Sequence, residues 1–126
     1  MASAQRRMLI VDDEQDICDC LESFFSLRGF SVDWAFSGEE ALQHLSRSRA
    51  DVILLDINLP GLSGIEVLRR AKELYPEIRV VIVTGLDYDE LREQAKHCGA
   101  AAYVTKPFDF SDLTWSAVLG WTSERR

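Results

Sequence analysis

The chain has 126 residues, enough for one domain with its own apolar core, and its composition of 47% hydrophobic and 28% charged residues is typical of globular proteins. Fourteen basic and twenty-one acidic residues give a net charge of −7, and the basic residues are scattered, which argues against direct nucleic-acid binding. No apolar stretch approaches the ~20 residues of a membrane span, and no signal-peptide pattern is present, so we expect a cytoplasmic protein without membrane contact. The three cysteines have no metal-ligand spacing, and a disulfide framework is not expected.

The first part of the chain predicts two strands and two helices. Residues 8–11 form an apolar run typical of a buried strand, and a helical pattern begins at Asp13. Residues 30–34 alternate between apolar and polar side chains, which predicts a strand at the edge of a sheet. Ser37 is followed three residues later by Glu40, a capping box that predicts the start of a second helix.

The middle of the chain predicts a strand that ends abruptly at an acidic residue. Residues 52–55 are apolar on both faces and are followed directly by Asp56. A loop over 58–62 comes next, and Ser63 with Glu66 forms a second capping box that opens the third helix.

The last part of the chain repeats the alternation of strand and helix. Residues 78–83 predict a fourth strand that ends at Thr84, and a helix is expected over about 87–99. Its predicted apolar face consists of Tyr88, Leu91, Ala95 and Cys98. Residues 101–104 predict the fifth strand, and a final helix spans about 111–122.

Five strands that alternate with five helices predict a doubly wound α/β fold with a five-stranded parallel sheet and helices on both faces. The edge pattern of the second strand favours the strand order 2-1-3-4-5. In such sheets, ligands bind beyond the carboxyl ends of the strands, at a switch point in the strand order.

Five polar residues follow the carboxyl ends of the predicted strands: Asp12, Asp13, Asp56, Thr84 and Lys106. Each alone has an ordinary explanation as a helix cap, a loop hydrogen bond or a surface charge. Together, however, three converging carboxylates would repel one another unless a cation or a lysine offset their charge. Carboxylate oxygens favour a hard cation, and a few of them supplemented by water suit magnesium better than calcium or zinc.

The residues at these strand ends resemble the receiver domain of two-component response regulators, a flavodoxin-like fold, over about 8–121. The segments that carry the resemblance are Leu-Ile-Val-Asp-Asp-Glu at 9–14, Leu-Leu-Asp-Ile-Asn-Leu-Pro-Gly at 54–61, Val-Thr-Gly at 83–85 and Tyr-Val-Thr-Lys-Pro-Phe at 103–108. We expect one receiver domain over 1–126, with its core at about 8–122 and no output domain in this chain.

The resemblance assigns a role to each residue of the expected site. It implies that Asp56 is the phosphoacceptor and that Asp12, Asp13 and Asp56, with the backbone carbonyl of Asn58, hold Mg²⁺. It also implies that Thr84 and Lys106 bind phosphoryl oxygens, that Tyr103 rotates with the state of the site, and that the peptide bond before Pro107 is cis.

The resemblance further implies a phosphoacceptor switch rather than an enzyme that turns over small molecules. A sensor histidine kinase or a phosphotransfer protein would supply the phosphoryl group from a phosphohistidine. The face formed by the fourth helix, the fifth strand and the fifth helix would contact an output partner or a second copy of the chain.

Three other functions fit parts of the sequence. An aspartate-nucleophile phosphatase would need a second acid two residues after Asp56, where Asn58 stands, together with a cap insertion. A flavodoxin-like cofactor binder would need a phosphate loop after the first strand, where residues 12–14 are acidic. A receiver that binds partners without phosphorylation is the third alternative, although no required residue is missing.

The final helix leaves two interpretations of Trp115. By spacing, Leu113, Ala117 and Trp121 share one face, which we expect to pack on the sheet. Trp115 then lies on a different face, either as boundary packing or as an aromatic anchor for a partner.

Overall fold

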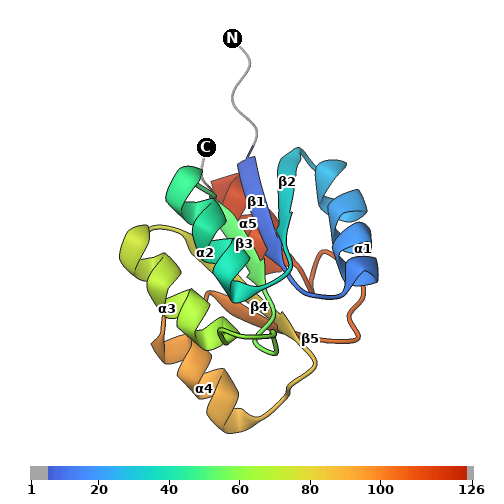
Figure 1. The fold of residues 1–126 in the computed structure, drawn as a ribbon. Coiled ribbons are helices and arrows are strands. Elements are labelled where there is room, and N and C mark those ends of the chain that lie inside the picture. The colour runs from blue at the N-terminus through green and yellow to red at the C-terminus, as the bar shows by residue number, and fades with distance from the viewer. Residues whose placement is uncertain (1–5, 125–126) are drawn as a thin grey trace.

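The computed structural model describes residues 6–124 and contains the predicted alternation of strands and helices (Figure 1). The elements are β1 (Arg6–Val11), α1 (Gln15–Ser26), β2 (Phe30–Ala35), α2 (Gly38–Arg47), β3 (Val52–Leu55), α3 (Gly64–Leu74), β4 (Arg79–Thr84), α4 (Asp89–His97), β5 (Ala102–Thr105) and α5 (Ser116–Glu124). All strand pairs are parallel, and the strand order is β2-β1-β3-β4-β5, as predicted. None of the helices within residues 6–124 has the length and apolar character of a membrane span.

The sheet has an apolar layer on each face because side chains alternate along every strand. On one face, Leu9 and Val11 of β1 and Ile53 and Leu55 of β3 join the core that α2, α3 and α4 cover. On the other face, the alternate residues of the same strands pack against α1 and α5. Both faces of the central strands are therefore buried, which explains why their sequences are continuously apolar.

Hydrogen bonds between neighbouring strands continue just beyond the ends of the ladders. The backbone N–H of Asp12 donates to Ala35 at 3.1 Å, and that of Asp56 donates to Val11 at 2.9 Å. Between β4 and β5, the backbone N–H of Lys106 donates to the carbonyl of Thr84 at 2.8 Å. The backbones that carry the polar residues are thus fixed relative to one another at a single edge of the sheet.

The two predicted capping boxes form to different extents. Ser37 accepts from the N–H of Glu40 at 3.1 Å, and the Glu40 carboxylate reaches back to the N–H of Phe36 at 2.8 Å. Ser63 likewise accepts from the N–H of Glu66 at 3.3 Å. The Glu66 carboxylate, however, pairs with two arginines further along the helix, so only half of the second box is present.

The structure corrects the predicted orientation of the final helix. Trp115 is fully buried, whereas Leu113, which we expected to pack on the sheet, is 86% exposed. The helix begins only at Ser116, after a turn that starts at Ser111, so its inward face is set by Trp115 and Val118 rather than by Leu113. The side chain of Trp121 lies outside the described residues.

Ring contacts explain why Trp115 is buried. Its ring centroid lies 5.4 Å from that of Phe25 and 5.2 Å from that of Phe108, both in edge-to-face geometry. Its Nε1–H donates to the carbonyl of Asp109 at 2.8 Å, so its polar atom has a partner. Packing rather than an exposed anchor is therefore the correct interpretation of Trp115, although the ring lies in the core and not at its boundary. The predicted burial of Tyr88 is also wrong, because this side chain is 59% exposed just before α4.

Candidate functional site

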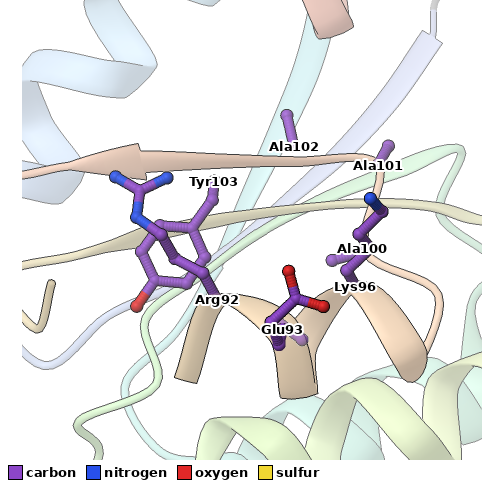
Figure 2. Close-up of a pocket in the computed structure, with 8 residues that line it drawn as sticks. Arg92, Glu93, Lys96, Ala100, Ala101, Ala102 and Tyr103 are labelled. Carbon is purple, nitrogen blue, oxygen red and sulfur yellow. The ribbon is translucent and has the colours of Figure 1, made fainter. Parts of the chain in front are cut away.

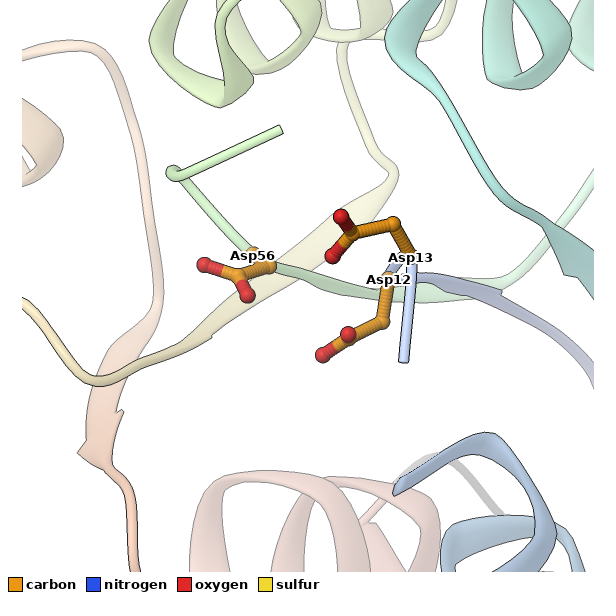
Figure 3. A group of neighbouring side chains, drawn as sticks. All are labelled: Asp12, Asp13 and Asp56. Carbon is orange, nitrogen blue, oxygen red and sulfur yellow. The ribbon is translucent and has the colours of Figure 1, made fainter. Parts of the chain in front are cut away.

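Three aspartates meet at the carboxyl ends of β1 and β3. One carboxylate oxygen from each of Asp12, Asp13 and Asp56 lies within 4.8 Å of the others. Figure 3 shows the three side chains extending from two neighbouring strand ends toward a common space. Asp12 and Asp56 are only 2% and 5% exposed, whereas Asp13 faces solvent. The convergence expected from the fold is therefore present, and two of its three members are taken almost completely out of water.

Lys106 supplies the opposing charge from the end of β5. Its Nζ lies 2.8 Å from Asp12 Oδ2, 2.9 Å from Asp56 Oδ2 and 2.7 Å from Glu14 Oε1. Burial lowers the pKa of Lys106, but the bonds to these three carboxylates outweigh it, so the pKa is raised and the ammonium stays charged. For Asp12 the balance is different, because burial raises its pKa more than Lys106 lowers it.

The Asp56 carboxylate is held at both oxygens. Oδ2 accepts from Lys106, and Oδ1 accepts from the backbone N–H of Asn58 at 2.9 Å. A cavity of about 340 Å³ opens beside it, and Asp13, Glu14 and Asn58 also line this cavity. A reactant that enters the cavity therefore meets an oriented, ionisable carboxylate with a cation at its side.

Gly64, the first residue of α3, lets the helix approach the backbone of Asp56. A Cβ at this position would lie 2.3 Å from the carbonyl oxygen of Asp56 and 2.5 Å from Cα of Ile57. The N–H of Gly64 donates to the carbonyl of Ile57 at 3.0 Å, which fixes the loop after β3. The sequence shows a glycine after the capping serine, but nothing in the motif reveals this close approach.

Thr84 and Tyr103 do not line the cavity beside Asp56, and both bond to Leu86. The hydroxyl of Thr84 is fully buried and accepts from the N–H of Leu86 at 3.4 Å. The hydroxyl of Tyr103 donates to the carbonyl of the same residue at 2.5 Å. Leu86 also lines the cavity beside Asp56, called the acidic cavity below. The connection from β4 to α4 therefore contacts both this cavity and Tyr103.

Tyr103 borders a second cavity of about 380 Å³ between α4 and β5 (Figure 2). The guanidinium of Arg92 lies 4.6 Å from the centroid of the Tyr103 ring, and Asp87 holds Arg92 with an ion pair of 2.8 Å. A cation over an aromatic face stabilises the position of the ring. Beyond β5, the peptide bond between Lys106 and Pro107 is cis.

The donor set of the acidic cavity fits a hard divalent cation. All three converging side chains offer carboxylate oxygens, and one lysine offsets only part of their charge. Carboxylates with room for water favour magnesium over softer metals that prefer nitrogen or sulfur ligands. The structure thus brings Asp12, Asp13, Asp56 and Lys106 into one site, with Asn58 beside them.

Comparisons with known proteins agree with this architecture. The family model for response regulator receiver domains matches residues 8–117. Sporulation initiation phosphotransferase F of Bacillus subtilis is 36% identical over 107 residues, which are 85% of this chain and 86% of that protein. The transcriptional regulatory protein DltR of Streptococcus agalactiae is 35% identical over 85% of this chain, which spans only 48% of that longer relative.

Solved structures show the same fold. A CheY-like receiver domain protein from Methanospirillum hungatei is 31% identical, with a TM-score of 0.85 over 96% of this chain and 93% of the other. The beryllofluoride-activated DrrB receiver domain is also 31% identical, with a TM-score of 0.84 over 96% of this chain and 99% of the other. The chain therefore belongs to the receiver domains of two-component response regulators.

Proposed function

We propose that this receiver domain accepts a phosphoryl group on Asp56 in a magnesium-dependent reaction. Receiver domains are signalling domains, and response regulators interact with histidine kinases or phosphotransfer proteins. A phosphohistidine on such a partner is the donor we propose here. The observation that supports this most is the placement of Asp56, whose carboxylate is held by Lys106 and by the N–H of Asn58 beside an open acidic cavity.

The transfer needs a nucleophile that is both ionised and aligned. A carboxylate oxygen of Asp56 forms a bond to phosphorus while the bond from phosphorus to the histidine nitrogen breaks, and the imidazole keeps that electron pair. Negative charge spreads over the equatorial phosphoryl oxygens, and the Lys106 ammonium is placed to neutralise part of it. Hydrolysis of the resulting acyl phosphate returns Asp56 to a carboxylate and resets the switch.

A magnesium ion would supply the remaining charge neutralisation. The residues that would hold it are Asp12, Asp13 and Asp56, with the backbone carbonyl of Asn58. Burial raises the pKa of Asp12 even though Lys106 lowers it, so added positive charge would favour the ionised form of this carboxylate.

The signal would leave the site through Thr84 and Tyr103. Both hydroxyls hold Leu86, so a Thr84 hydroxyl that turns toward a phosphoryl oxygen would give up its bond to the Leu86 N–H. That change would bias the position of Tyr103 between two states and alter the α4–β5–α5 face. This face would then bind an output partner or a second copy of the chain.

The acceptor assignment is tested by incubating the protein with Mg²⁺ and acetyl phosphate and measuring phosphate incorporation. Wild type should take up one phosphoryl group, and Asp56→Asn should take up none, because an amide does not attack phosphorus. Asp16→Asn, which removes an exposed charge from the first turn of α1, is the matched control and should behave like wild type. Undiminished uptake by Asp56→Asn would overturn the assignment. Turnover of many unrelated phosphate esters would favour the phosphatase alternative instead.

A further inference from the structure

The ammonium of Lys106 has no free donor in this structure. A protonated lysine carries three N–H bonds, and Nζ contacts three carboxylates at hydrogen-bond distance: Asp12 at 2.8 Å, Glu14 at 2.7 Å and Asp56 at 2.9 Å. A phosphoryl oxygen on Asp56 would need one of the same three protons. A phosphoryl oxygen can therefore reach Lys106 only in place of one of these three carboxylate contacts.

Burial identifies the carboxylate that is released most easily. The side chain of Asp12 is 3% exposed, and its second oxygen accepts from the backbone N–H of Glu14 at 2.9 Å, so both of its oxygens are held. The side chain of Asp56 is also almost completely buried, and it carries the phosphoryl group itself. The side chain of Glu14 is 59% exposed, and within residues 6–124 its carboxylate bonds only to Lys106, so water can take the place of the lysine.

Glu14 also places negative charge at the cavity through which the donor approaches. It lines this cavity together with Asp13 and Asp56. A phosphoryl group that carries negative charge is repelled by a carboxylate at the rim of the cavity.

We infer that Glu14 is a releasable partner of Lys106 that holds the lysine in the unphosphorylated state and opposes phosphoryl binding. It acts through Lys106 and is a positioning residue, not a catalytic one. The inference rests on the proposed function of Asp56 and assigns to Glu14 a regulatory role in the same site. Removing its charge should make Lys106 available and tighten the binding of a phosphoryl group.

The test uses beryllofluoride, a phosphoryl analogue, at saturating Mg²⁺, with its affinity measured by calorimetry. Glu14→Gln should bind beryllofluoride about 2- to 5-fold more tightly than wild type, the range expected for loss of one partly exposed ion pair. Asp16→Asn removes one charge from the same end of α1 and has no contact with Lys106 among the described residues, so its affinity should match that of wild type.

Two further measurements separate release of Lys106 from a general charge effect. The tighter beryllofluoride binding of Glu14→Gln should persist at high salt, because salt weakly screens a short contact to a lysine that is only 13% exposed. If the tighter binding came only from long-range repulsion by the Glu14 charge, high salt should abolish it. A separate Mg²⁺ titration corrects for any change in metal affinity.

Equal or weaker beryllofluoride binding by Glu14→Gln, after correction for Mg²⁺ affinity, would overturn the inference while leaving the acceptor role of Asp56 intact. An equal gain in Asp16→Asn would also overturn it, because charge alone would then explain the result. If wild type itself binds no beryllofluoride, the proposed function fails and the inference fails with it.

Discussion

Replacing Trp115 by alanine should destabilise the domain by about 4 kcal/mol. The side chain is fully buried, and truncation of a buried tryptophan typically costs about 3–5 kcal/mol through lost burial and the cavity left behind. The change also removes the bond from Nε1–H to the Asp109 carbonyl, worth about 1 kcal/mol. With an unfolding entropy of about 2.1 cal/mol/K per residue over 126 residues, a loss of about 4 kcal/mol lowers Tm by about 15 °C.

Thermal and urea unfolding, followed by circular dichroism, measure this loss, and Trp115→Phe is the matched control. Phenylalanine keeps most of the ring contacts with Phe25 and Phe108 but loses the hydrogen bond, so it should cost about 1–2 kcal/mol. Both variants should still be phosphorylated at Asp56 below their Tm. If Trp115→Ala unfolds within about 1 kcal/mol of wild type but loses association that depends on phosphorylation, the packing argument is wrong and Trp115 is a partner anchor.

Gly64→Ala should destabilise the fold by about 1–3 kcal/mol and slow phosphorylation, because its Cβ would lie 2.3 Å from the backbone oxygen of the phosphoacceptor. Gly120→Ala, which has open space in exposed helix, should instead stabilise the fold by about 0.5–1 kcal/mol, and urea unfolding of both variants checks the pair. Burial raises the pKa of the Cys18 thiol to about 12, so at pH 8 this thiol is not ionised in the folded protein. A disulfide reagent, which reacts with thiolates, should therefore label exposed Cys20 but should label Cys18 only after unfolding. Thr84→Ala should retain some phosphorylation but should weaken the change in self-association or partner binding that phosphorylation causes. Sedimentation with and without beryllofluoride measures this change, and a response equal to that of wild type would mean that Thr84 does not relay the signal.

The fold and the carboxylate cluster could be predicted because both depend on short-range patterns. Strands such as 52–55 are apolar on both faces, and a parallel sheet places the residues after such strands at one edge. Asp12, Asp13 and Asp56 follow neighbouring strands, so the sheet topology alone brings them together. Their convergence could therefore be predicted without knowing any side-chain contact.

The features that the sequence did not reveal depend on contacts between distant or non-periodic residues. Glu14 meets Lys106 across 92 positions, and a single glutamate after two aspartates gives no sign of that contact. The orientation of the last helix was wrong because hydrogen bonds among Asp109, Ser111 and Thr114 form a separate turn ahead of it. Helical spacing counted from Leu113 therefore started in a segment that is not part of the regular helix.

The most direct test of the account is chemical mapping of the phosphorylated residue. After incubation with Mg²⁺ and acetyl phosphate, borohydride reduces an aspartyl phosphate to homoserine, and peptide mass spectrometry locates the change. The account predicts homoserine at position 56 in wild type, and none when the metal is chelated or when Asp56 is replaced by asparagine. Homoserine at Asp12 or Asp13, or uptake of phosphate with Asp56 unchanged, would contradict it.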